Sequence, residues 1–130
     1  MTEERQYNLF FLNDYFNNEM EAILPILQMY LEETPKELAN IEKCLLLNDV
    51  DAAKAATHKI KTNISMLSIR DQSSFVYVMH SLNAGDSIDS SVKKEFALFS
   101  TTVMKALHQI RIDFFEREDN APDAGSNTPG

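Results

Sequence analysis

The sequence predicts an all-α protein, an antiparallel four-helix bundle with a short extra N-terminal helix. The 130-residue chain has only three glycines, and its apolar residues recur at steps of three and four, which is the helical period. Strand-like alternation of apolar and polar residues is scarce. With 44% apolar residues, the length fits one domain, which we place at residues 1–117. Residues 118–130 are polar, and we expect a disordered tail there.

The first two predicted elements lie before Asn48. A short helix is expected before Asn18, where five residues are too apolar to be free: Leu9, Phe10, Phe11, Tyr15 and Phe16. Between Asn18 and Asn48 the helical period continues, and Thr34, Pro35 and Glu37 resemble a helix start with a capping box. We therefore expect two helices there, or one helix interrupted near Thr34. Pro25 either kinks the first of them or marks its first turn.

Three further helices complete the predicted bundle. Asn48-Asp49 offers a cap for a helix that continues to about Met66. The next is expected from Asp71 to about Asn83, ended by the turn signal Ala84-Gly85-Asp86. The last starts near Ser90 and presents an apolar stripe as far as Phe114.

Composition excludes several classes of function. The chain has 20 acidic and 12 basic residues, a balance that argues against nucleic-acid binding. Its single cysteine, Cys44, rules out a disulfide framework and a cysteine-based zinc site. The scarcity of glycine excludes phosphate-cradling loops, and with them most nucleotide-using enzymes. No apolar run approaches a membrane span and no signal peptide is recognisable, so we expect a cytoplasmic protein with no membrane partner.

One histidine lies in a basic patch. Lys54, four residues before His58, and Lys61, three residues after it, are its neighbours on a helix surface, and Lys59 adds a third amine. Residues 52–70 contain no Asp or Glu. Ammonium groups disfavour the imidazolium and stabilise negative charge delivered to the ring nitrogen. The pattern is therefore suited to a histidine that accepts a phosphoryl group, with a surface histidine among solvated lysines as the alternative.

The twelve residues Ala56-Thr57-His58-Lys59-Ile60-Lys61-Thr62-Asn63-Ile64-Ser65-Met66-Leu67 resemble the signature of histidine-containing phosphotransfer (HPt) domains. The resemblance implies that His58 is the phosphorylated histidine, that Ile60 is the buried leucine of the pattern and that Lys61 steadies the phosphoryl group. Helix order and length extend it over roughly residues 18–114. It also implies a polar residue on the next helix that orients the imidazole, a role for which His80 is the candidate.

Two departures from the HPt pattern affect the expected activity. Thr62 replaces the usual glycine just after the lysine, and Ser68 replaces a second one. Thr62 could narrow the approach of a partner or donate a hydrogen bond to the phosphoryl oxygens. These changes leave open a transfer-deficient docking module as the alternative. Gln72 and Tyr77 are weaker candidates for the partner surface.

The resemblance predicts a phosphorelay intermediate of two-component signal transduction. His58 would take a phosphoryl group from a receiver-domain aspartate of a hybrid histidine kinase and pass it to the receiver of a response regulator. The chain would be a monomer, a separate protein or alternatively a domain cut from a longer hybrid kinase. It would not itself be an enzyme and would have no cofactor of its own, because Mg²⁺ would be held by the receiver. No histidine has Glu or Asp three residues before it, which argues against a di-iron site, so no metal is expected. A plain adaptor whose lysines bind an acidic partner remains the rival from another class.

Overall fold

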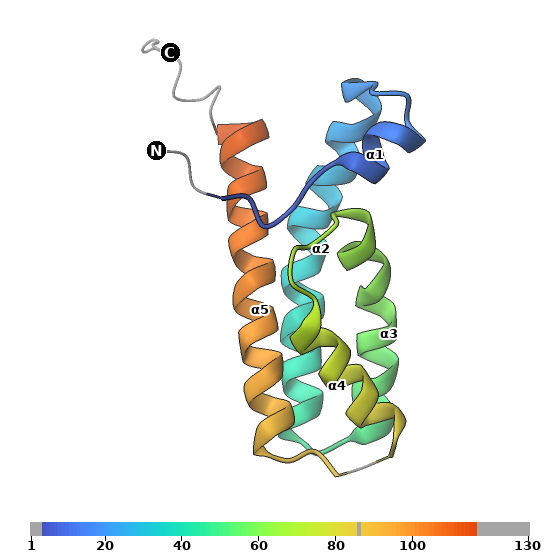
Figure 1. The fold of residues 1–130 in the computed structure, drawn as a ribbon, viewed down its shortest axis with the longest axis vertical. Helices are drawn as coiled ribbons and strands as arrows, with labels where there is room; N and C mark the ends of the chain where they lie inside the picture. The colour runs from blue at the N-terminus through green and yellow to red at the C-terminus, as the bar shows by residue number, and fades with distance from the viewer. Residues whose placement is uncertain (1–3, 86, 117–130) are drawn as a thin grey trace.

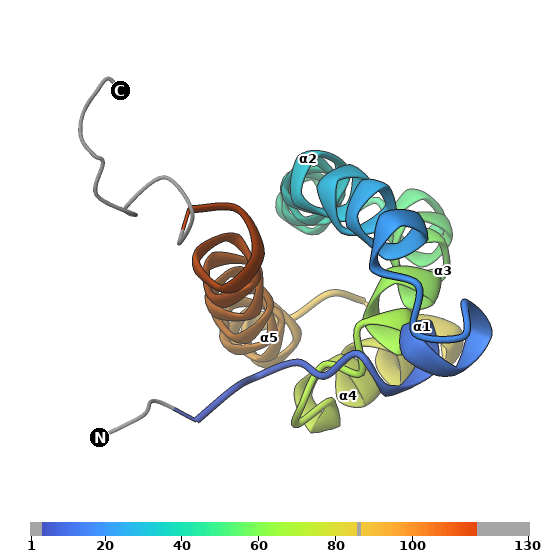
Figure 2. The ribbon, with the colours of Figure 1, turned by 90° about the horizontal axis from the view of Figure 1, so that it is seen from above.

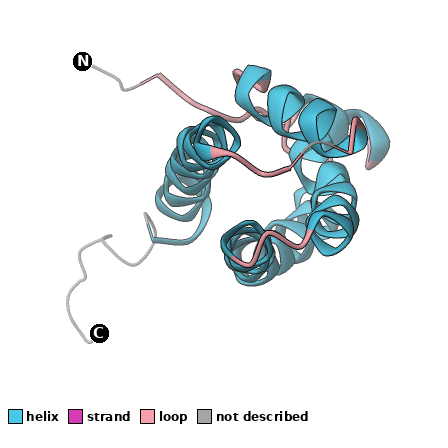
Figure 3. Cartoon of the chain, turned by 90° about the horizontal axis from the view of Figure 1, so that it is seen from below, coloured by secondary structure: helices cyan, strands magenta, loops and turns pink. Residues whose placement is uncertain are grey.

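The computed structural model describes residues 4–85 and 87–116, and every regular element within them is a helix (Figure 3). The elements are α1 (Phe10–Tyr15), α2 (Met20–Leu46), α3 (Val50–Met66), α4 (Ser73–Asn83), α5 (Ser90–Arg111) and a π-helical turn, η1 (Ile112–Glu116). From α2 to α5 successive helices run in opposite directions (Figure 1). Both α2 and α4 pack against α3 and α5, which closes the bundle. The predicted all-α four-helix bundle with a short N-terminal helix is confirmed.

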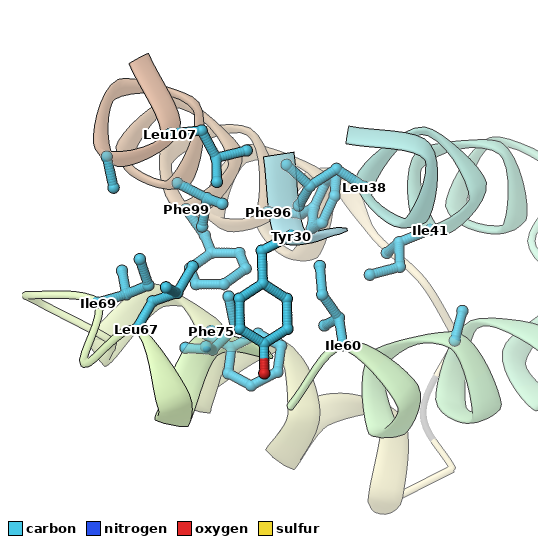
Figure 4. Packing of buried hydrophobic residues seen from close by; sticks show 14 of the residues in the cluster. Tyr30, Leu38, Ile41, Ile60, Leu67, Ile69, Phe75, Phe96, Phe99 and Leu107 are labelled. Carbon is cyan, nitrogen blue, oxygen red and sulfur yellow. The ribbon is translucent and has the colours of Figure 1, made fainter. Parts of the chain in front are cut away.

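The core is built from large side chains of all four bundle helices. The rings of Phe75 on α4 and Phe99 on α5 stack with their centroids 4.6 Å apart. Ile60 of α3 is fully buried beside this pair, and Tyr30 reaches in from α2 (Figure 4). Burying a side chain of this size contributes about 1.5–3 kcal/mol. Because Ile60 faces the core, the opposite face of α3 is turned to solvent.

Helix α2 corrects one prediction. It is a single helix that continues through Pro25 and Pro35, with no start at Thr34. Thr34 is fully buried, and its hydroxyl accepts a hydrogen bond of 3.1 Å from Asn63 Nδ2 instead of capping a helix. The sequence on both sides of Pro35 buries one continuous apolar stripe against the core, so packing overrides the break that proline favours.

The predicted caps and turns agree more closely. Asp49 Oδ1 accepts a 3.1 Å hydrogen bond from the Ala52 amide at the start of α3, as expected. Helix α4 ends before Ala84. The next residue, Gly85, has a φ of 76°, a conformation that glycine adopts freely. It begins at Ser73, two residues later than expected, with Asp71 bonded to the Ser73 amide and hydroxyl. Asp86 and the predicted tail at 118–130 lie outside the described residues.

An extended strap of residues 4–9 crosses one end of the bundle, from α5 to the connection between α3 and α4 (Figure 2). At η1, which directly follows α5, the Arg5 guanidinium donates to both carboxylate oxygens of Asp113, at 2.7 and 2.6 Å. The Gln6 amide donates to Gln109 Oε1 at 2.8 Å, and the Arg70 amide donates to the Gln6 carbonyl at 2.8 Å. The strap therefore ties α5 to the end of α3.

Helix α1, which follows the strap, exposes much of its apolar surface. Leu12 is fully buried and Leu9 packs against the core. Phe10, Phe11 and Tyr15 are instead 69%, 52% and 75% exposed. The predicted helix forms. The expectation that its apolar residues would be packed away from solvent is wrong for these three of the five residues. A six-residue helix has only one narrow face to bury.

Candidate functional site

Helix α3 presents His58 to solvent in the middle of its outward surface. Asp49 fixes the start of the helix, and the buried positions Ala53, Thr57, Ile60 and Ile64 fix its rotation against the core. His58 follows Thr57 by 100° around the helix and is exposed. Within the described residues its side chain makes no hydrogen bond or ion pair. The predicted phosphoryl acceptor is therefore accessible on a rigid element.

Two hollows run along the boundary between α3 and α4. One of about 370 Å³ is lined by Asp51, Lys54, Ala55, Thr57, His58, Met79 and Asn83. The other, of about 300 Å³, is lined by Lys61, Ser65, Gln72, Phe75, Val76, Met79, His80 and Asn83. Met79 and Asn83 line both hollows. We call this surface, formed by the lining residues of both hollows, the α3–α4 face.

The α3–α4 face brings together four of the six predicted site residues, but not in the expected pairing. Lys54 shares a hollow with His58, whereas Lys61 shares the other hollow with His80. No hydrogen bond joins His58 to His80 among the residues the structure describes. The orienting role of His80 therefore stays a prediction. The polar residue of α4 that lines the His58 hollow is Asn83.

Lys59 lies on the other flank of α3, toward α2. It lines a hollow of about 160 Å³ with Glu33, Glu37 and Asn40. Burial raises the pKa of the Glu37 carboxyl, the positive charge of Lys59 opposes that rise, and the charge of Glu33 adds to it. The sequence grouped Lys59 with the amines around His58, but the structure sets it beside carboxylates of α2.

Asn63 anchors this α2-facing flank. Its amide donates to Thr34 Oγ1 at 3.1 Å and to Glu37 Oε1 at 2.8 Å, and the residue is 9% exposed. Both bonds cross from α3 to α2. A buried amide that finds two acceptors fixes the two helices relative to each other, and with them the position of His58.

The two positions that depart from the HPt pattern have different settings. Thr62 is exposed and lies one helical turn after His58, on the same outward surface. Ser68 lies just after α3 with φ at 47°, in the left-handed region that glycine occupies without strain. The backbone conformation thus explains why a glycine suits position 68. Thr62 is the departure that bears on access to the imidazole.

Several residues of the α3–α4 face were missed by the sequence analysis. Ser65, Val76 and Asn83 line the hollows, and Val76 is 60% exposed. Helical spacing could have identified two of them in the sequence. Val76 lies four residues before His80, and Asn83 lies three residues after it. Gln72, a weak candidate from the sequence, also lines the face, and Tyr77 of α4 is 45% exposed.

The described residues form neither a metal site nor a membrane-spanning helix. No group of three or more His, Cys, Asp or Glu side chains lies close enough to hold a metal ion. None of the described helices combines the length and the apolar character needed to cross a bilayer. Cys44 is buried, as is typical of a cysteine that packs as a small apolar side chain.

Comparison with known proteins adds no further assignment. No protein-family model matches the chain, and neither a curated protein nor a solved structure matches it. A function therefore has to be inferred from the chemistry of the α3–α4 face and from the short sequence signature around His58.

Proposed function

We propose that this chain is a phosphorelay intermediate in which His58 carries the phosphoryl group. The observation that carries the proposal is an exposed imidazole on a bundle helix between two exposed lysines, Lys54 and Lys61. Within the part of the chain that the structure describes, this imidazole has no hydrogen-bonding partner. The resemblance of residues 56–67 to the HPt signature supports it independently of the geometry.

The proposed reaction is a displacement at phosphorus. A nitrogen of the neutral His58 imidazole attacks the phosphoryl group of a receiver aspartyl phosphate. The bond between phosphorus and the aspartate oxygen breaks, and the aspartate leaves as a carboxylate. The exposed ring then releases the proton of its other nitrogen to water. Lys54 and Lys61 offset the negative charge of the transferred group. Transfer to a second receiver reverses these steps, so the chain is a carrier and not an enzyme.

The partner surface around His58 suits a receiver domain. A receiver brings its aspartyl phosphate and Mg²⁺ in an acidic pocket, which complements the lysines of α3. Ala55 lies next to His58 in its hollow, and its small side chain leaves room for close approach. Val76 and Tyr77 supply exposed apolar area on the neighbouring helix. We place the protein in the cytoplasm as a monomer, with no nucleic-acid or membrane partner.

Thr62 favours a second candidate, a docking module that binds a receiver without accepting its phosphoryl group. Its branched side chain stands one turn from His58, where the HPt pattern has glycine. In that case receiver binding persists and transfer does not.

Phosphotransfer from a labelled receiver tests the proposal. Wild-type protein, His58→Gln and the matched control His108→Gln, which changes an exposed histidine on α5, are mixed with a phosphorylated receiver and Mg²⁺. We expect acid-labile, base-stable phosphate on the wild type and on His108→Gln, and none on His58→Gln. Retained binding without label on any protein would support the docking module. Loss of both binding and label would refute the family assignment.

A further inference from the structure

His80 lies in a hollow whose chemistry suits a second anion. The hollow of about 300 Å³ between α3 and α4 places this exposed imidazole on one rim and Lys61 on the other. Ser65, Gln72 and Asn83 supply neutral donors around it. The Gln72 amide also donates to the Ile69 carbonyl at 3.0 Å, which holds its side chain at the edge of the hollow.

The charge around this hollow favours an anion more clearly than the charge around His58. Among residues 4–85 and 87–116 no Asp or Glu lines it, although the chain carries 20 acidic residues. The His58 hollow includes Asp51, and the hollow beside Lys59 includes Glu33 and Glu37. Phe75 and Met79 give the hollow an apolar wall beside these polar groups.

We propose that His80 is a second phosphoryl-accepting histidine, with Lys61, Ser65, Gln72 and Asn83 as the donors that hold the phosphoryl oxygens. A nucleophilic nitrogen, a cation and neutral hydrogen-bond donors around one cavity are the groups that favour phosphoryl transfer to a histidine. The inference goes beyond the proposed function, because a small phosphoryl donor reaches His80 without any receiver docked at His58.

The donor class that isolates this step is a phosphoramidate. A nitrogen of the His80 imidazole attacks its phosphorus, the bond from phosphorus to the donor nitrogen breaks, and ammonia leaves with the bonding electrons. The proton lost from the other ring nitrogen is taken up by ammonia, so charge and atoms balance. Neither a metal nor a nucleotide is required.

The test measures phosphorylation of His80 in a variant that lacks the His58 imidazole. His58→Gln is incubated with phosphoramidate, and attachment of one phosphoryl group is followed by intact-mass spectrometry at alkaline pH, with the position mapped by fragmentation. The double variant His58→Gln/His80→Gln retains only His108 and gives the background rate of an exposed histidine. We expect His58→Gln to be labelled at position 80 at least about tenfold faster than this background.

Two lysine variants show whether the hollow is responsible. In the His58→Gln protein, Lys61→Ala should lower labelling of His80 to the rate of His108, whereas Lys59→Ala on the opposite flank should leave it unchanged. Both lysines are exposed, and circular dichroism checks that both variants keep the helical fold. Labelling of His80 no faster than His108, or a rate indifferent to Lys61, would overturn the proposal. A residue that only orients His58 would be labelled no faster than His108.

Failure here is distinguishable from failure of the proposed function. The receiver assay reports transfer to His58 in the wild type, and the phosphoramidate assay reports His80 when position 58 cannot react. A chain that passes the first and fails the second has one phosphoryl site. A chain that fails the first and passes the second has a phosphorylatable hollow but no demonstrated relay function.

Discussion

The two flanks of α3 use the same kinds of residue for opposite purposes. Toward α2, Asn63 is bonded to Thr34 and Glu37, and Lys59 faces the carboxylate of Glu37. Toward α4, His58 and Lys61 are exposed and make no hydrogen bond or ion pair within the described residues. One flank therefore holds the bundle together, while the other leaves its polar groups available to a ligand or partner.

The difference has an energetic basis. Removing one partner from a buried hydrogen bond leaves the other unsatisfied and costs about 1–3 kcal/mol. Changing an exposed side chain that has no partner usually alters stability by less than about 0.5 kcal/mol. The α4-facing flank can therefore carry a reactive group at little cost to folding, whereas the α2-facing flank cannot lose its polar side chains without a penalty.

The largest expected effect is on stability, at Asn63. Asn63→Leu removes both hydrogen bonds to α2 and leaves Thr34 and Glu37 without this donor in a partly apolar setting, so we expect a loss of about 1–3 kcal/mol in the free energy of unfolding. Ser65→Ala, an exposed change on the other flank, should stay within about 0.5 kcal/mol. Urea denaturation measures both. Equal effects of the two substitutions would remove the distinction between the flanks.

The next effect is on transfer. Lys61→Ala should slow phosphoryl acceptance from a receiver about tenfold, or about 1.4 kcal/mol in the barrier, because it removes a cation three residues from His58. Lys59→Ala should change the rate by less than about twofold, since that charge is directed toward Glu37. Initial rates with one phosphorylated receiver give the ratio. If both variants slow transfer equally, the two lysines act through the overall electrostatic potential of the protein, and the flank on which each lysine lies does not matter.

The sequence predicts a structural feature well when the residues that form it lie close together along the chain. The caps at Asp49 and the turn at Gly85 are local, and the residues alone identify them. The helical period of the apolar residues likewise fixed which face of α3 is buried. Thr34 was misread because a threonine before proline favours a helix start locally, and only the distant Asn63 shows why its hydroxyl lies in the core.

Helical spacing alone could predict the candidate site only along its own helix. His58, Lys54 and Lys61 are neighbours by helical spacing, so a single segment reveals them. Which residues of α4 face them depends on how α3 and α4 are set against each other, and a period alone does not determine that. The sequence therefore named His80 as the neighbour of His58, whereas the hollow that contains His58 also contains Asn83.

Thr62, on the outward surface between the flanks, has a smaller expected effect. Thr62→Gly removes a branched side chain one turn from His58, and we expect transfer about threefold faster. The cost in stability is about 0.5 kcal/mol, since glycine is a poor helix former. Ala55→Gly, on the preceding turn, is the control for that backbone cost and should not speed transfer. A slower Thr62→Gly protein would instead indicate that the threonine hydroxyl binds the phosphoryl oxygens.

The smallest effect is the pH dependence contributed by Glu37. Burial raises the pKa of its carboxyl in the folded protein above the usual 4.5, so the folded state holds this proton more tightly than the unfolded state. Below that pH both states are protonated and Glu37 contributes nothing. As pH rises from about 4.5 through the folded pKa, the ionised carboxylate increasingly disfavours the folded state.

Glu37→Gln isolates this contribution, because glutamine keeps an oxygen that can accept from Asn63 but carries no charge. Relative to wild type, Glu37→Gln should gain stability as pH rises from about 4.5 to 7, by no more than about 0.5 kcal/mol because Glu37 is partly exposed. Lys59→Ala should make the wild-type dependence steeper, since Lys59 opposes the rise in the Glu37 pKa. Urea midpoints across this pH range measure both differences. If the stability difference between Glu37→Gln and wild type stays constant or falls as pH rises, Lys59 fully compensates the burial of the Glu37 carboxylate. Ionised groups on the α2-facing flank would then cost the folded state no more than those on the flank that carries His58.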